Sequence, residues 1–168
     1  DWPVEASSWV PAESAEFDAL AFGALPLSLH GSADAVLFIR ALHNLARFGE
    51  HRDYLFEALN DALMLLKPGG TLGVVQHRAP VGSSDDWSNG SNGYLKESFV
   101  IEAAENAGFE FVDSSDHNFN DRDKPTEGDM VWRLPPTMLG SENNENRASE
   151  MLAIGESDRM TLKFRKPL

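Results

Sequence analysis

The sequence predicts an α/β fold in which helices cover a largely parallel sheet. Two short apolar runs, 35–39 and 71–76, have the length and the β-branched content of buried strands. A segment with the apolar spacing of a helix, 50–66, joins them, and a further helix and two further strands follow. Strands that alternate with helices in this way are typical of parallel sheets with helices on their faces.

The first and the last predicted strands differ in pattern. Residues 35–39 read Ala-Val-Leu-Phe-Ile and follow the turn-forming residues 30–34. Because apolar residues occupy consecutive positions, we expect this strand to be buried on both faces. Residues 160–165 alternate between apolar and polar types, which predicts one covered face and one wet face, as at the edge of a sheet.

Two segments have helical periodicity. In 50–66, Leu and Ala recur on one face, acidic residues lie near the start, and Lys-Pro-Gly-Gly at 67–70 predicts the end of the helix. The second helix is predicted over 94–107, with Gly108 after its end. Its expected apolar stripe consists of Leu95, Phe99, Ala103 and Ala107.

The remaining segments are mostly irregular. Residues 80–93 consist of turn formers and predict a loop, and its length is typical of a functional segment rather than of a plain connection. A short strand at 109–112 leads into the polar, acidic segment 113–129. A second long excursion, 135–146, precedes a short helix at 147–154.

Composition excludes several classes of protein. With 168 residues and 42% apolar residues, the chain can bury the core of one ordinary domain. A net charge of −13 argues against binding to nucleic-acid phosphates, and the lack of cysteine excludes disulfides, thiolate zinc sites and cysteine nucleophiles. No apolar run approaches the roughly 20 residues that span a bilayer. We therefore expect no nucleic-acid partner, no membrane partner and a cytoplasmic location.

Four stretches contain motifs in a fixed order. They are Phe-Asp-Ala-Leu, Leu-Pro-Leu and Ser-Ala-Asp-Ala-Val-Leu within 17–37, Leu-His-Asn-Leu at 42–45, Ala-Leu-Met-Leu-Leu-Lys-Pro-Gly-Gly-Thr-Leu at 62–72, and Ala-Glu-Asn-Ala-Gly-Phe at 104–109. Together they resemble the carboxyl-terminal half of the class I S-adenosylmethionine-dependent methyltransferases. A finer similarity, through Arg-Ala-Leu-His-Asn-Leu, is to an uncharacterised bacterial group of methyltransferases.

The resemblance implies a fold, a cofactor and a set of contacts. The fold would be a Rossmann-like methyltransferase sheet, mostly parallel with an antiparallel last strand, and the cofactor would be S-adenosylmethionine. Residues 17–168 would form the carboxyl-terminal half of the domain, and 1–16 an arm or leftover connection. The carboxylate of Asp18 would accept a hydrogen bond from the adenine amino group while a neighbour packs on the ring. The implied cofactor-binding residues are Phe17, Asp18, Ala19, Arg40, Leu42 and Asn44.

One departure from the family concerns its glycine-rich loop. No two glycines of this chain stand two residues apart. The stretch before Phe17 is also too short for three strand–helix units of roughly 30 residues each. We therefore expect the amino-terminal strands to be missing from this chain, which is then either a fragment or a protein that has lost its cofactor site.

Basic side chains follow two neighbouring strands of the predicted sheet. Arg40, His43 and Asn44 come after the first strand, and His77 and Arg78 come after the second. Because the carboxyl ends of parallel strands meet at one edge, we expect a basic rim that binds an acidic or polar acceptor, or a carboxylate of the cofactor. The expected catalytic residues are His43, His77 and Arg78, with His43 as the general base. In the alternative, His43 and Asn44 only cap a helix and bond the backbone.

Two aromatic residues flank the Gly/Ser-rich loop, and no metal motif is present. Trp87 and Tyr94 are either a lid over the acceptor or a local hydrophobic anchor. No pair of potential ligands has the i, i+4 spacing of a helical zinc motif, so we expect no metal.

These observations predict methyl transfer from S-adenosylmethionine to a small-molecule acceptor, with this chain as the acceptor-side half. The alternative is a non-catalytic binding or scaffolding remnant of the same fold. In either case strand 35–39 presents an apolar edge, which folded proteins normally cover. We expect residues 1–16, upstream residues or a second copy in a homo-oligomer to cover it. We also expect the chain alone to bind S-adenosylmethionine poorly.

Overall fold

The computed structural model describes residues 19–49 and 53–168, which form an α/β arrangement around one sheet. Within these residues the sheet has four strands, in the order β1-β2-β4-β3. The strands are β1 (Ala33–Ile39), β2 (Leu66–His77), β3 (Glu110–Ser115) and β4 (Arg159–Arg165). The helices are η1 (Leu27–Leu29), α2 (Leu42–Ala46), α3 (Tyr54–Leu65), α4 (Glu97–Asn106), η2 (Asp116–Asn118), η3 (Val131–Arg133) and α5 (Glu145–Ile154). The predicted fold class is confirmed.

The directions of the strands agree with the prediction, but the place of the last strand does not. β1 and β2 run parallel, with Ala35 opposite Thr71, and β4 is antiparallel to both β2 and β3. The predicted antiparallel last strand is therefore confirmed. Its predicted position at an edge is wrong, because β4 pairs on both sides. The alternation along β4, with Leu162 buried and Lys163 exposed, instead reflects one face that helices cover.

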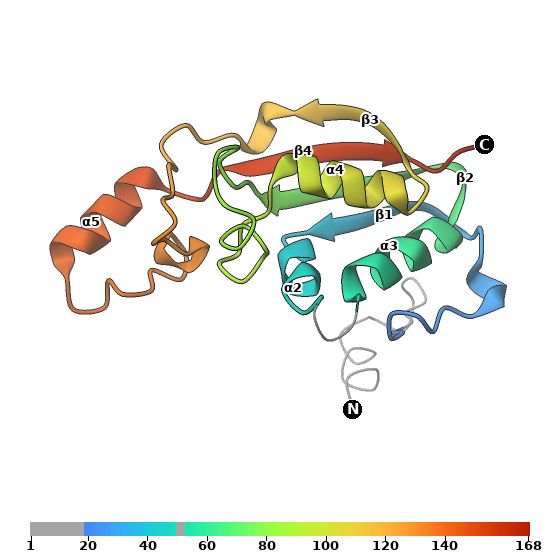
Figure 1. Ribbon diagram of the computed structural model, residues 1–168, viewed down its shortest axis with the longest axis horizontal. Coiled ribbons are helices and arrows are strands. Elements are labelled where there is room, and N and C mark those ends of the chain that lie inside the picture. Colours follow the sequence, from blue (N-terminus) through green and yellow to red (C-terminus); the bar gives the residue numbers. More distant parts are fainter. Residues whose placement is uncertain (1–18, 50–52) are drawn as a thin grey trace, which may run out of the picture.

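Helices α3 and α4 lie across one face of the sheet, and α2 follows the end of β1 (Figure 1). Asp53 starts α3, since its Oδ1 accepts a hydrogen bond from the backbone N–H of Phe56 at 3.0 Å. Side chains of α3 and α4 form one core with alternate residues of the strands. The fully buried members of this core include Ala58, Leu59, Leu72, Val74, Ala104, Met160 and Phe164. This packing fixes the carboxyl ends of β1 and β2 beside each other.

Two predicted boundaries are wrong. The second strand begins at Leu66, which pairs with Ala33, rather than at residue 71. The second helix begins at Glu97 rather than at residue 94. The predicted end of the first helix is confirmed to within one residue, because α3 ends at Leu65 and Leu66 is its C-cap. Strand pairing, which no local pattern reports, decides where β2 begins.

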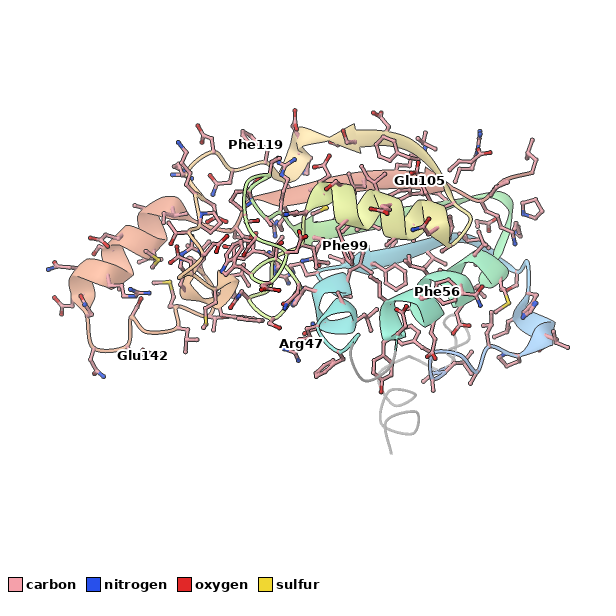
Figure 2. All side chains as sticks on the ribbon, in the orientation of Figure 1. Arg47, Phe56, Phe99, Glu105, Phe119 and Glu142 are labelled. Carbon is pink, nitrogen blue, oxygen red and sulfur yellow. The ribbon has the colours of Figure 1, made fainter. Side chains whose placement is uncertain are left out.

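The apolar stripe predicted for α4 is wrong at one position. Leu95, Ala103 and Ala107 pack in or against the core, Leu95 from the segment before the helix, whereas Phe99 is 42% exposed. Val100 and Ala104 are the fully buried residues of this helix. Phe99 lines a surface groove together with Phe56 of α3 (Figure 2).

The first strand was expected to be buried on both faces of the sheet, but its side chains on the face opposite these helices are exposed. Phe38 of β1 is buried in the core, but Leu37 and Ile39 are 64% and 58% exposed. Their positions alternate with Phe38, so they point to the other face. Among the described residues β1 pairs only with β2. The predicted burial on both faces is therefore wrong for this part of the chain, and the covering of the β1 edge stays a prediction.

The connecting segments gather beyond the carboxyl ends of β1 and β2 (Figure 1). They comprise the loop 78–96, the stretch 119–144 with η3, and α5, whose N-cap Asn144 accepts a hydrogen bond from the N–H of Arg147 at 3.0 Å. Of these segments, the stretch 119–144 contributes residues 131–137 to the lining of the candidate site. No helix in the described part of the chain is long and apolar enough to cross a bilayer.

Candidate active site

A cavity of about 400 Å³ lies at the carboxyl ends of β1 and β2. Residues that follow β1 form one side of it, His77 at the end of β2 forms its floor, and the stretch 131–137 forms the opposite wall. Its lining comprises Ile39, Arg40, His43, Asn44, His77, Val131, Trp132, Leu134, Pro135, Pro136, Thr137, Glu156, Ser157 and Arg159. Open α/β sheets bind ligands at this position, where parallel strands end.

A buried amide fixes the tautomer of His43. The Oε1 of Gln76 lies 3.3 Å from the backbone N–H of His43 and 3.2 Å from its Nδ1. The Nε2 of Gln76 donates to the carbonyl of Gly93 at 2.8 Å, so the oxygen of the amide must face His43. Because that oxygen can only accept, the Nδ1 of His43 carries the hydrogen. The lone pair of the neutral ring is therefore on Nε2.

The electrostatic environment keeps His43 neutral. Burial lowers the pKa of His43 below 6.5, the hydrogen bond to Gln76 opposes this shift, and the charges of Arg47 and Arg40 lower the pKa further. Within residues 19–49 and 53–168, Nε2 has no hydrogen-bond partner. His43 lines the cavity, and a buried, neutral imidazole with a free ring nitrogen can accept a proton from a molecule bound beside it.

His77 lies beside His43 and is also neutral. The centroids of the two rings are 5.5 Å apart, and the Nδ1 of His77 lies 2.6 Å from the hydroxyl oxygen of Ser157. Burial lowers the pKa of His77 to about 3, and the neighbouring His43, Arg159 and Arg40 add to this effect. At neutral pH the uncharged ring orients Ser157 and shapes the cavity floor.

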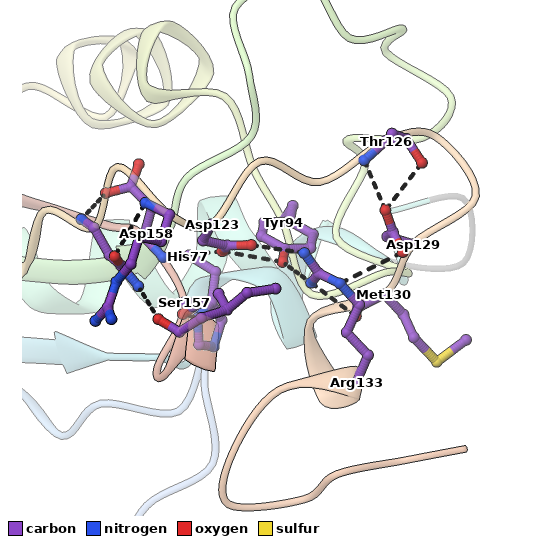
Figure 3. Close-up of polar contacts among 12 residues, drawn as sticks. His77, Tyr94, Asp123, Thr126, Asp129, Met130, Arg133, Ser157 and Asp158 are labelled. Atoms are coloured by element: carbon purple, nitrogen blue, oxygen red, sulfur yellow. Dashed lines mark hydrogen bonds and ion pairs between the residues drawn. The ribbon is translucent and has the colours of Figure 1, made fainter. Parts of the chain in front are cut away.

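A buried ionic network holds the opposite wall in place (Figure 3). The guanidinium of Arg133 donates to Asp123 at 2.7 Å and to the hydroxyl of Tyr94 at 2.8 Å, and its Nε lies 3.4 Å from Asp129. The side chains of Arg133 and Asp123 are 5% and 0% exposed. Since a buried charge is stable only with partners, this network ties η3 to the loop before α4.

Trp87 and Tyr94 take the role of an anchor in this wall. Both rings are buried, and they stack with centroids 5.1 Å apart. Burial raises the pKa of the Tyr94 hydroxyl, which the nearby carboxylate of Asp123 raises further. Neither residue lines the cavity. Of the two sequence interpretations, the structure supports the hydrophobic anchor.

Arg78, which the sequence places in the catalytic set, does not reach the cavity. It donates to both carboxylate oxygens of Asp158, at 2.9 and 3.0 Å, and to Glu97 at 2.9 Å. These partners raise its pKa and hold the side chain in a different groove. The physical reason is strand geometry: successive residues point to opposite faces, so His77 and Arg78 diverge.

The predicted cofactor residues fall into three groups. Phe17 and Asp18 lie outside the described residues. Ala19 and Leu42 are described but do not line the cavity, and Leu42 is buried in the core. Arg40 and Asn44 do line the cavity, beside His43.

The sequence-based prediction omitted much of the cavity. Gln76 stands next to His77 in the sequence, yet only its contact with His43 reveals a function for it. Trp132, Ser157 and Arg159 come from segments more than 50 residues away from His77 or from the far end of the chain. No local motif marks them, because long-range folding brings them to the cavity.

Comparisons with known proteins give the fold. No protein-family model and no curated protein matches the sequence. Three of the similar solved structures are the [4+2]-cyclase SpnF, a protein described as a methyltransferase in complex with the Haloferax volcanii activator Trm112, and a Methanosarcina mazei S-adenosylmethionine-dependent methyltransferase. Their identities to this chain are 21%, 18% and 13%, and the TM-scores are 0.55, 0.56 and 0.55. The fold is that of the class I methyltransferases.

This chain corresponds to only part of each solved structure. The matches cover 91%, 99% and 98% of this chain, but this chain spans only 56% of the cyclase, 68% of the Haloferax protein and 76% of the Methanosarcina protein. The methyltransferase fold therefore accounts for nearly all of this chain. At these identities the similarity establishes the fold and leaves the residues of the cavity to be interpreted from their own chemistry.

Proposed function

We propose that this chain forms the acceptor side of an S-adenosylmethionine-dependent methyltransferase and that His43 is its general base. The observation that carries the proposal is the tautomer of His43, in which Gln76 holds the hydrogen on Nδ1 while Nε2 keeps its lone pair beside a cavity. The methyltransferase fold and the position of the cavity at the ends of parallel strands support a group transfer at this place.

The proposed reaction is an in-line displacement at a methyl carbon. S-adenosylmethionine supplies a methyl group bound to a positively charged sulfur. A hydroxyl or amine of the acceptor would form the new bond to the methyl carbon as the carbon–sulfur bond breaks and S-adenosylhomocysteine leaves, and the proton of that hydroxyl or amine would move to the Nε2 of His43. The protein contributes mainly by positioning the two reactants and by keeping His43 neutral until the proton arrives.

The described residues fit one flank of the cofactor. Arg40 and Asn44 offer hydrogen-bond donors at the rim of the cavity. Leu42, which is buried beneath them, contributes through packing. The resemblance to methyltransferases assigns the adenine end to Phe17, Asp18 and Ala19. No two glycines of this chain stand two residues apart, so the sequence has no counterpart of the glycine-rich loop that would hold the methionine end.

The donor side of the proposed enzyme would come from additional strands that pair with β1. Leu37 and Ile39 expose apolar side chains on the uncovered face, and the outer edge of β1 is unpaired among the described residues. A folded protein normally covers such an edge. The greater length of the similar solved structures supports an amino-terminal half of the same domain as the cover, with a second copy of this chain as the other option.

A labelling experiment tests the proposed activity. The chain, together with the reading frame that precedes it, is incubated with methyl-labelled S-adenosylmethionine and the low-molecular-weight fraction of a cell extract. We expect label in a small molecule, and a loss of labelling in the His43→Ala variant. Cofactor binding without any transfer of label contradicts the proposal.

A non-catalytic or differently reacting protein of the same fold is the second candidate. One of the similar structures is described as a [4+2]-cyclase, so the methyltransferase fold does not by itself determine the reaction. Under this candidate the cavity binds a ligand, but His43 receives no proton. Binding of a ligand in the cavity without transfer of label to any small molecule would favour it.

A further inference from the structure

Two arginines line the cavity of a chain whose net charge is −13. Arg40 follows β1 with a φ of 54°, in the left-handed region that non-glycine residues rarely adopt. Its backbone N–H donates to the carbonyl of Val75 at 2.7 Å, which holds it in that conformation. Strained residues of this kind persist where the fold over-determines them, and they cluster at functional sites. The side chain of Arg40 has no ion-pair partner among the described residues.

The second arginine, Arg159, has an unsatisfied donor. One of its terminal nitrogens, Nη2, pairs with Glu156 at 2.6 Å and lies 3.4 Å from the amide oxygen of Asn118. Its Nε is buried and has no hydrogen-bond partner in the described structure. Leaving a buried donor unpaired costs about 1–3 kcal/mol, more for a charged group. The guanidinium of Arg159, which lines the cavity, therefore keeps unused donor capacity.

The other lining residues compensate only part of this positive charge, because Glu156 pairs with Arg159 and none of them pairs with Arg40. His43 and His77 are neutral at pH 7 because their pKa values are lowered, in part by these same arginines. Glu156 is the one carboxylate among the lining residues, and its side chain is 57% exposed and already paired with Arg159. The cavity therefore favours a negatively charged molecule.

The shape of the cavity restricts that molecule further. Trp132, Pro135 and Pro136 form a rigid apolar wall, and the ring of Trp132 lies edge-on to His43 with centroids 6.0 Å apart. A volume of about 400 Å³ is at the small end of the range for ligand sites. A small molecule with a flat ring against this wall and polar groups toward the rest of the lining, which is mostly polar, matches the cavity.

We infer that the methyl acceptor is a small aromatic anion, whose carboxylate or phosphate binds between Arg40 and Arg159 while its hydroxyl or amine lies at the Nε2 of His43. This inference rests on the proposed function, because it calls the bound molecule a methyl acceptor. The binding of the anion itself does not depend on methyl transfer. It reassigns Arg40 from the cofactor to the acceptor. Arg159 becomes a specificity-determining residue.

Binding of three probes tests the inference without any turnover. Titration calorimetry compares 4-hydroxybenzoate, 4-hydroxyphenyl phosphate and the neutral 4-hydroxybenzamide on the chain with its preceding reading frame. We expect at least one anion to bind about tenfold more tightly than the amide, as a charge-assisted hydrogen bond is roughly twice as strong as a neutral one. The better anion also tells a carboxylate acceptor from a phosphate one. NMR should show the pKa of His77 rising when the anion binds, because the negative charge offsets the two arginines.

Matched variants locate the anion. Arg40→Gln and Arg159→Gln should each abolish the preference for the anion, whereas Arg159→Lys should retain part of it. Arg47→Gln is the control, because Arg47 is exposed on the segment next to His43 and does not line the cavity. Circular dichroism of each variant checks that it is folded.

Several results overturn the inference. They are equal binding of the anions and the amide, no binding of any probe, and an anion preference that survives both Gln variants. A loss of S-adenosylhomocysteine binding in Arg40→Gln with unchanged probe binding would return Arg40 to the cofactor and also overturn it. Anion preference without methyl transfer would contradict the proposed function and support the inference as a ligand site.

Discussion

The Nδ1 of His43 lies 3.2 Å from the Oε1 of Gln76, and this contact decides which nitrogen of the imidazole is available for chemistry. Gln76 is completely buried, and its Nε2 is held by the carbonyl of Gly93. Gln76 is therefore a positioning residue, which acts on a bound molecule only through His43.

Substitutions of Gln76 should move the pKa of His43 in opposite directions. In Gln76→Glu, a carboxylate accepts from Nδ1 and favours the charged imidazole, so the pKa should rise. In Gln76→Leu, the hydrogen bond that now raises the pKa is lost, so the pKa should fall further below 6.5. NMR titration of the imidazole measures both values. Shifts of the same sign in both variants would disprove this account of the contact.

His43→Ala should lower turnover by about 100-fold or more, with little change in cofactor affinity, because general-base catalysis typically contributes about 10²–10⁴-fold. The matched control is His117→Ala, at an exposed position in η2. The labelling assay measures turnover, and calorimetry with S-adenosylhomocysteine measures affinity. If His43→Ala is as active as the control, His43 has only a structural role near the start of α2.

The stability of the protein should fall in mild acid because of His77. Its pKa is about 3 in the folded protein and near 6.5 in the unfolded chain. Below pH 6.5 the unfolded chain therefore binds a proton that the folded protein does not, so the free energy of unfolding decreases as the pH falls. The slope is about 1.4 kcal/mol per pH unit between these two values.

The variant His77→Gln removes this titration. Urea denaturation from pH 7.5 to pH 4 should show a shallower pH dependence for His77→Gln than for the wild type, while His117→Gln should match the wild type. Parallel curves for His77→Gln and the wild type would show that His77 is not buried in its neutral form.

The ion pair of Arg133 and Asp123 should contribute far more to stability than an exposed one of similar length. Arg133→Met leaves Asp123 buried and unpaired, which typically costs about 3–5 kcal/mol. The control is Arg165→Met, which breaks a half-exposed pair with Glu110 and should cost about 1 kcal/mol or less. Chemical denaturation compares the two variants. Equal losses would mean that the network does not hold the wall.

The sequence predicted well those elements that depend on residues adjacent in the chain. The strands at 35–39 and 160–165 came from runs of apolar or alternating residues, and the convergence of His43 and His77 followed from the rule that parallel strands end at one edge. Arg78 was misplaced, because its neighbourhood in the sequence does not show which face it takes.

Features that depend on long-range contacts could not be predicted in this way. The wall with Trp132 and the donor of Arg159 reach the cavity only through the folding of the excursion 119–158. The exposure of Leu37 likewise depends on which segment packs against β1. The run of apolar residues around Leu37 does not report this packing.

The most direct test of the central claim is calorimetric titration of S-adenosylhomocysteine into two proteins: residues 1–168 alone, and the same chain with its preceding reading frame. If this chain is the acceptor side and the donor side pairs with β1, the 168 residues should bind weakly and the longer protein tightly with one site. Hydrogen exchange should then also show that the amides of β1 that do not bond to β2, on its outer edge, are protected in the longer protein only. Tight, stoichiometric binding by the 168 residues alone would contradict the account.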